Sequence, residues 1–134
     1  MPAVAFDHFN LRAGRDLVER LRDFYVDVVG LRVGARPPFD FHGYWLYIGD
    51  QAVLHLVDDA AAPRVGDARA GTFDHVAFAC RDMPAFERHL QALGVPYRRS
   101  VVPGRGQAQI FVCDPAGNGV ELNFDLGGAS GRAD

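Results

Sequence analysis

The triplet Phe-Asp-His occurs twice in the chain, in FDHFNLRA at residues 6–13 and in FDHVAFAC at residues 73–80. Apolar and polar residues alternate in both segments, which is typical of a strand with one buried face. A helix-like segment that opens with Arg-Asp follows each copy. Because the same order of segments follows each triplet, the sequence predicts two copies of one structural unit.

A helix is predicted after each copy. Apolar residues recur at helical spacing in LVERLRDFYVDVVG, which follows Asp16, and in MPAFERHLQALG, which follows Asp82. Gly30 and Gly94 are the predicted helix ends, because glycine readily adopts the left-handed backbone of a C-terminal cap. Asp16 together with Glu19 predicts a capping box at the start of the first helix.

Three strand-like segments follow each helix, at residues 31–36, 43–50 and 52–57, and at 96–102, 107–114 and 119–124. Each half therefore reads strand–helix–strand–strand–strand. The predicted fold class is α+β, with tandem βαβββ modules at residues 1–57 and 72–125, a linker at 58–71 and a flexible tail at 126–134. One half is too small to bury both a helix and a sheet face, so we expect one structural domain overall.

Composition narrows the classes of function. The 134 residues carry a net charge of −3, which predicts neither a nucleic-acid nor a membrane partner. No apolar run is long enough for a membrane span, and the N-terminal residues lack the pattern of a signal peptide. Two cysteines do not form a disulfide framework, so a cytoplasmic location is expected.

Polar residues that could bind a metal recur at equivalent strand positions. Side chains two apart share a face of a strand, so His8 is expected beside Asn10, His75 beside small residues, and Glu121 beside Asn123. Alignment of Leu-His-Leu at 54–56 with Val-Glu-Leu at 120–122 pairs His55 with Glu121. A single strand histidine is weak evidence for a ligand. Two or three imidazoles with one carboxylate, repeated by the duplication, predict a divalent-metal site.

These residues resemble those of a known family. The paired modules, FYVDVVGLRVG at 24–34 and FVCDPAGNGVELNF at 111–124 resemble the vicinal oxygen chelate superfamily, the glyoxalase, bleomycin-resistance and extradiol-dioxygenase group. The resemblance implies sheets that curl around a metal-binding cup, with His8, His75 and Glu121 as ligands. Some members add a glutamate or glutamine on the fourth strand, where this chain has His55. It also implies a homodimer.

The resemblance implies a divalent-metal enzyme, with Zn, Ni, Mn, Co or Fe(II), that acts on a small-molecule substrate. Substrate oxygens on the metal would develop enolate or enediolate charge, which the cation stabilises. A glyoxalase-type lyase or isomerase is the preferred interpretation, with Glu121 as the catalytic proton carrier. Alternatives are an extradiol-type Fe(II) dioxygenase and a resistance protein that modifies or sequesters a small molecule.

The remaining pocket residues are predicted from strand position. Asn10 and Asn123 follow the candidate ligands on the same faces. Gln109 shares a strand face with Phe111, which matches a pocket position of the family. Tyr47 is assigned to the pocket or, alternatively, to the core.

Overall fold

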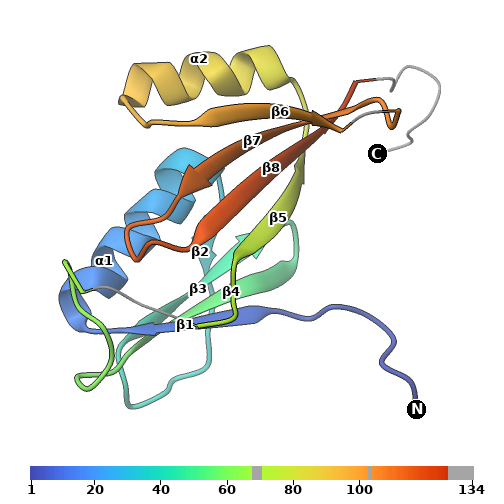
Figure 1. The fold of residues 1–134 in the computed structure, drawn as a ribbon. Coiled ribbons are helices and arrows are strands. Elements are labelled where there is room, and N and C mark those ends of the chain that lie inside the picture. Colours follow the sequence, from blue (N-terminus) through green and yellow to red (C-terminus); the bar gives the residue numbers. More distant parts are fainter. Residues whose placement is uncertain (68–70, 103, 127–134) are drawn as a thin grey trace. The chain divides into compact units, whose positions relative to one another are not determined.

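A computed structural model describes residues 1–67, 71–102 and 104–126 (Figure 1). The chain divides into two compact units, residues 1–69 and 70–134. We call them the first and second modules and describe each by itself. Residues 68–70 of the predicted linker and 127–134 of the predicted tail lie outside the described residues.

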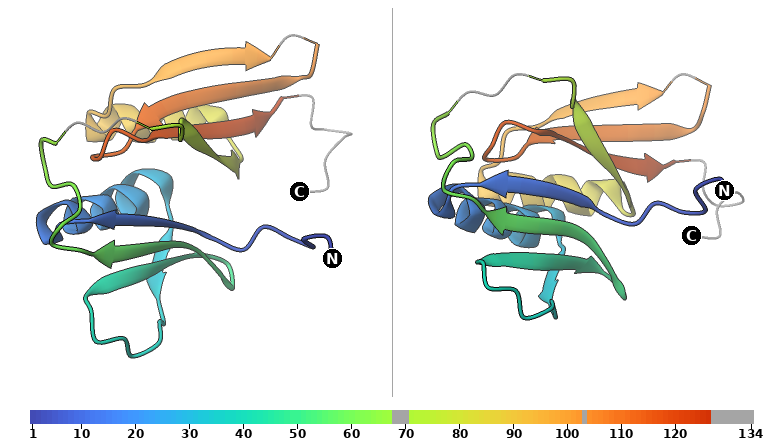
Figure 2. Two further views of the ribbon diagram at one scale, coloured as in Figure 1. Left: turned by 60° about the horizontal axis from the view of Figure 1, so that its bottom comes forward. Right: turned by 90° about the horizontal axis from the view of Figure 1, so that it is seen from below.

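The first module is a four-stranded mixed sheet with one helical segment (Figures 1 and 2). Its strands lie in the order β1-β4-β3-β2, with β1 parallel to β4 and the other pairs antiparallel. In chain order the elements are β1 (Phe9–Ala13), α1 (Arg15–Phe24), the π-helical turn η1 (Tyr25–Val29), β2 (Arg32–Gly34), β3 (Gly43–Ile48) and β4 (Gln51–Asp58).

The second module repeats this arrangement. Its sheet has the order β5-β8-β7-β6, and β5 is parallel to β8. The elements are β5 (His75–Cys80), α2 (Met83–Leu93), β6 (Arg98–Val102), β7 (Gln107–Cys113) and β8 (Gly119–Asp125). The predicted α+β class and the tandem βαβββ modules are therefore confirmed.

Each helix covers one face of its own sheet. Leu17, Val18 and Leu21 of α1 are buried, as are Leu54 and Leu56 on the facing strand. In the second module the Phe86 ring of α2 lies 5.6 Å from the Phe124 ring of β8. Burial of each leucine contributes roughly 1.5–3 kcal/mol.

The helix ends agree with the prediction at three of four places. Gly30 and Gly94 end the helical segments with positive φ, and Asp82 caps α2 by accepting a hydrogen bond from the Ala85 N–H at 3.1 Å. The predicted capping box at Asp16 is wrong, because α1 begins at Arg15 with Gly14 at the N-cap. The Gly14 N–H donates to the Pro63 carbonyl, and this bond holds the chain at the observed N-cap, two residues before the predicted one.

Two other details differ from the prediction. β1 begins at Phe9, so His8 lies immediately before the strand, and β2 covers only Arg32–Gly34 of the predicted residues 31–36. Among the described residues, no helix is both long and apolar enough to cross a membrane.

Candidate metal centre

His75 and Glu121 lie together in the second module. They come from the parallel neighbours β5 and β8, and His75 Nε2 is 3.2 Å from Glu121 Oε1. Gly119 permits this approach, because a Cβ at that position would come within 2.9 Å of the His75 Cβ. The Glu121 side chain is only 9% exposed, whereas that of His75 is 39% exposed. The strand pairing thus directs one imidazole and one buried carboxylate to the same point.

Glu121 is fixed by two amides. Gln109 Nε2 donates to Glu121 Oε2 at 3.0 Å, and Asn123 Nδ2 donates to the same oxygen at 3.2 Å. Both amides are predicted pocket residues. A buried carboxylate requires such partners, and they leave Oε1 as the oxygen that faces His75.

Both triplet histidines are held by the aspartate that precedes them. His75 Nδ1 lies 2.8 Å from an Asp74 carboxylate oxygen, and His8 Nδ1 lies 2.7 Å from one of Asp7. The bond to Asp74 raises the pKa of His75, against a lowering by burial, and the Glu121 charge raises it further. With Nδ1 engaged, Nε2 is the nitrogen available to a metal. The sequence prediction omitted these aspartates, although both belong to the repeated triplet.

In the first module, three rings form a stack. The His55 ring lies between His8, at a centroid distance of 3.7 Å, and Trp45, at 4.0 Å. Trp45 is the direct cross-strand partner of His55, and Asn10 is its partner on β1. Burial lowers the pKa of His55, and the neighbouring His8 lowers it further. The prediction did not anticipate Trp45 at this position.

The segment before β1 is held by Gln51. Its Nε2 donates to the carbonyl oxygens of Phe6 at 3.1 Å and Asp7 at 2.6 Å. This contact positions the residues on which His8 depends. Gln51 is the first residue of β4, and no sequence pattern marked it.

Tyr47 and Phe111 have different surroundings. The Tyr47 ring fills the space above Gly34, and its hydroxyl donates to the Ala35 carbonyl, so Tyr47 packs against β2. Phe111 presents an edge-on contact to His75, with ring centroids 6.3 Å apart. A pocket of about 530 Å³ lies at the C-terminal ends of β5 and β8, where Ala77, Ala79 and Asn123 contribute to its lining, and neither His75 nor Glu121 lines it.

The donor groups fit a divalent cation to different extents. Within either module, the described residues gather no group of three or more histidine, cysteine or acidic side chains. His75 Nε2 and Glu121 Oε1 are close enough to be adjacent ligands of one ion, and His8 also has a free Nε2. His55 fits less well. The in-plane lone pairs of the nearly parallel His8 and His55 rings, 15° apart, do not converge on one point.

Comparison with known proteins identifies the family. Residues 5–122 match the model of the Glyoxalase/Bleomycin resistance protein/Dioxygenase superfamily. The chain belongs to this superfamily. His8, His75 and Glu121 lie at the positions for which the resemblance to the superfamily implies metal ligands.

Two curated relatives have glyoxalase names. Glyoxylase I 4 of Arabidopsis thaliana is 29% identical over 110 residues, which cover 78% of this chain and 63% of the plant protein. Lactoylglutathione lyase of Pseudomonas putida is 28% identical over 152 residues, covering 90% of this chain and 87% of that protein. The chain thus matches less than two thirds of the length of the plant relative.

Solved structures share the fold. A glyoxalase family protein from Bacillus anthracis has a TM-score of 0.72 at 21% identity, covering 92% of this chain and 96% of its own. Lactoylglutathione lyase of Agrobacterium tumefaciens has a TM-score of 0.66 at 26% identity, covering 96% and 99%. A variant of the fosfomycin resistance protein FosX from Listeria monocytogenes, solved with Mn(II) and a dihydroxypropylphosphonic acid, has a TM-score of 0.66 at 12% identity, covering 92% of each.

Proposed function

We propose that the chain is a divalent-metal-dependent enzyme of the glyoxalase type, a lyase or isomerase that acts on a small molecule. The pairing of His75 Nε2 with the buried Glu121 Oε1 at 3.2 Å is the observation that carries the proposal. The lactoylglutathione lyase and glyoxylase I relatives, at 28% and 29% identity, support this class.

His75, Glu121 and His8 are the proposed metal-holding residues. Neutral imidazole and carboxylate are suitable donors for Zn, Ni, Mn, Co and Fe(II). A bound divalent cation would supply Lewis-acid stabilisation of negative charge on a substrate oxygen. Asp74 and Asp7 orient the two imidazoles, as carboxylates behind metal-binding histidines commonly do.

Glu121 is the proposed catalytic base. Gln109 and Asn123 hold its Oε2, so the carboxylate cannot rotate freely, and Oε1 is free of amide contacts. A carboxylate so oriented is suited to take a proton from a substrate carbon and return it to a neighbouring atom. The pocket beside Asn123 is the proposed place for the substrate.

The position of His55 distinguishes a metal site with four protein ligands from one with three. As a fourth ligand it would have to leave the stack between His8 and Trp45. If it stays there, three ligands remain, and two histidines with one carboxylate also suit an Fe(II) dioxygenase. We propose that His55 stays in the stack, so that His55→Ala binds metal with nearly the affinity of the parent protein. An extradiol-type dioxygenase is therefore the second candidate.

Metal titration tests the proposal first. Metal-free protein is titrated by calorimetry with Mn(II), Zn(II), Ni(II) and Co(II), and with Fe(II) under anaerobic conditions. We expect binding that is lost in His75→Ala and Glu121→Gln and retained in the control His89→Ala, which alters an exposed residue of α2. A parent protein that binds none of these ions would refute the proposal.

Turnover then separates the two candidates. The lyase or isomerase predicts conversion of the hemithioacetal of glutathione and methylglyoxal, or exchange of a substrate α-proton with deuterated water. The dioxygenase predicts oxygen consumption with catechols and Fe(II). Glu121→Gln should abolish proton exchange, because it removes both a proposed metal-holding carboxylate and the proton acceptor.

A homodimer is also proposed, since each sheet ends in edge strands that can pair with a second copy. Sedimentation analysis gives the mass. Refolding a mixture of His8→Ala and Glu121→Ala shows whether two chains share a site. If each site takes ligands from both chains, a mixed dimer contains one complete site and regains metal binding. If each site lies within one chain, the mixture binds no metal.

A further inference from the structure

Arg36 lies on the sheet face that carries Trp45 and His55. Its Nη2 occupies the space above Gly43, where a Cβ would come within 3.4 Å of it. Gly43 and Trp45 are two residues apart on β3 and therefore face the same way. Trp45 in turn stacks on His55. The guanidinium thus lies on the same sheet face as His55.

Two phenyl rings surround this guanidinium. The rings of Phe39 and Phe41 stack with centroids 4.8 Å apart, and the Arg36 Cζ lies 5.0 Å and 5.3 Å from them. Phe39 also lies 6.4 Å from Trp45, so aromatic groups continue from Arg36 to His55. Phe39 and Phe41 remain 43% and 40% exposed, which leaves apolar surface for a ligand.

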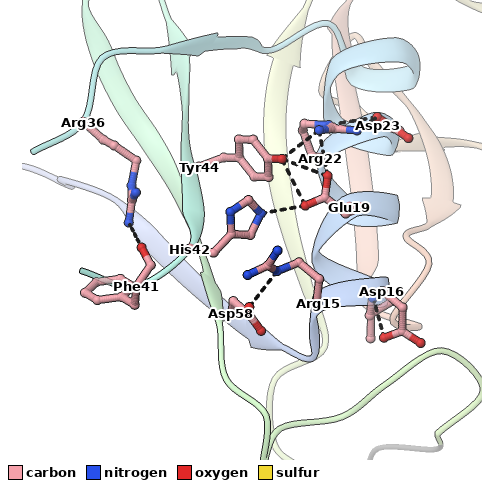
Figure 3. Close-up of polar contacts among 11 residues, drawn as sticks. Arg15, Asp16, Glu19, Arg22, Asp23, Arg36, Phe41, His42, Tyr44 and Asp58 are labelled. Atoms are coloured by element: carbon pink, nitrogen blue, oxygen red, sulfur yellow. Dashed lines mark hydrogen bonds and ion pairs between the residues drawn. The ribbon is translucent and has the colours of Figure 1, made fainter. Parts of the chain in front are cut away.

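The charge of Arg36 has no carboxylate partner among residues 1–67, 71–102 and 104–126. Its Nη2 donates to the Phe41 carbonyl at 3.1 Å, and its buried Nε has no acceptor. Figure 3 shows the contrast with Arg15 and Arg22, whose guanidinium groups reach the carboxylates of Asp58 and Glu19. A guanidinium has five N–H donors in a planar fork, and most of those of Arg36 are uncommitted.

We propose that Arg36 binds a carboxylate of the substrate and that the planar, apolar part of the substrate lies against Phe39 and Phe41. A carboxylate can accept from the two terminal Nη groups together, which matches the fork of arginine. Aromatic or unsaturated carboxylates are the assigned substrate class. The inference rests on the proposed function only in treating the bound carboxylate as substrate.

Calorimetry with benzoate and benzamide tests the inference on the full chain without metal. The two probes have the same size and ring, and only benzoate carries the charge. We expect benzoate to bind more tightly than benzamide, and Arg36→Gln to raise the benzoate Kd at least about tenfold, or 1.4 kcal/mol. Arg36→Lys should fall between, because it keeps the charge and loses the fork.

Arg32→Gln is the matched control. Arg32 also lies over a ring, that of Tyr47 at 5.3 Å, and also donates to a backbone carbonyl, that of Gly49 at 2.7 Å. Its removal should leave benzoate binding unchanged. Equal affinity of the parent protein for the two probes, absence of benzoate binding, or an unchanged Kd in Arg36→Gln would each overturn the inference.

Metal titration of the same variants separates the two proposals. Arg36→Gln should bind metal as the parent does. If no variant binds metal while benzoate still depends on Arg36, the proposed function fails and the carboxylate site stands. If the parent protein binds metal and the benzoate Kd is the same in Arg36→Gln and the parent, only the carboxylate-site proposal is refuted.

Discussion

The aspartate of the repeated triplet determines which nitrogen of the following histidine is free. An imidazole presents two nitrogens, and a hydrogen bond at one selects the other for metal binding. Asp7 and Asp74 take Nδ1 in both modules, at 2.7 and 2.8 Å. The duplication has therefore preserved an oriented histidine, which is more specific than a histidine alone.

Replacing Asp74 tests this orientation. Asp74→Asn removes the charge behind His75 and should weaken metal binding by about 10–100-fold, the usual effect of losing such a partner. Asp7→Asn should act similarly through His8. The control is Asp50→Asn, which changes an exposed turn residue. Equal metal affinity of Asp74→Asn and the parent, measured by calorimetry, would contradict the assigned role.

The sequence anticipated more about Glu121 than about His55. Strand alternation placed Asn123 beside Glu121, and Gln109 was predicted in the same pocket. The carboxylate does bond to both amides. The plane of the His55 ring depends on Trp45, which is adjacent only through the pairing of β3 with β4. Cross-strand partners of this kind require the register, which local patterns do not determine.

At the level of elements, α1 is joined to the sheet by a polar network around Glu19 (Figure 3). The Glu19 carboxylate accepts from His42 Nε2 at 2.7 Å, from the Tyr44 hydroxyl at 2.8 Å and from Arg22 at 2.8 Å. Burial raises the pKa of Glu19, but the bonds from His42 and Tyr44 and the Arg22 charge outweigh it, so the pKa is lowered. The sequence had suggested a capping role for Glu19.

Removing the Glu19 charge should therefore destabilise the fold in a pH-dependent way. We expect Glu19→Gln to lower the free energy of unfolding by about 1–2 kcal/mol at pH 7. Because the folded-state pKa is lowered, the stabilisation by the Glu19 charge is fully present above the ordinary value of 4.5. It declines as the pH falls below that value and is lost below the folded-state pKa. Urea denaturation at several pH values measures the free energy of unfolding of Glu19→Gln and of the parent protein.

The difference between Glu19→Gln and the parent should then vanish in acid. Asp23→Asn, at an exposed partner of Arg22, should change stability by less than about 0.5 kcal/mol. A pH-independent loss in Glu19→Gln would show that its effect is steric.

The start of α2 combines a cap with an unusual backbone. Asp82 accepts from the Ala85 N–H and has a φ of 62°, a conformation that favours glycine over alanine. Asp82→Ala should cost about 1–2 kcal/mol, because it loses the cap and keeps the strained backbone. Asp82→Gly should cost less, since it relieves the strain. Thermal denaturation of Asp82→Ala and Asp82→Gly measures the two losses of stability. An equal loss in both variants would exclude a contribution from backbone strain.

At the scale of the whole molecule, the duplicated fold could be predicted because its signals are local. Helical spacing, strand alternation and glycine stops recur in each half, and the two sheets have the same strand order. The prediction was wrong where a contact between residues far apart in the sequence sets the end of an element. The start of α1 is an example, because the Gly14 N–H donates to the Pro63 carbonyl just before the helix. The metal ligands were proposed from repeat symmetry, which identifies equivalent positions without measuring distances.

Metal should stabilise the whole chain if ligands from both modules are needed. At a free metal concentration 100 times the Kd, binding adds about 2.7 kcal/mol to the free energy of unfolding. We expect a corresponding rise in Tm for the parent and none for His8→Ala or His75→Ala. A full rise in His8→Ala would show that the second module holds the ion without the first.

Trp45 is the only tryptophan in the chain, and its indole lies against the His55 ring at 4.0 Å. Its fluorescence therefore comes from one position, in direct contact with the candidate site. A protonated imidazole in such contact quenches indole emission, and any departure of His55 from the stack alters that quenching. The protein thus carries its own optical probe, which reports the state of this half of the site without a label or a substrate.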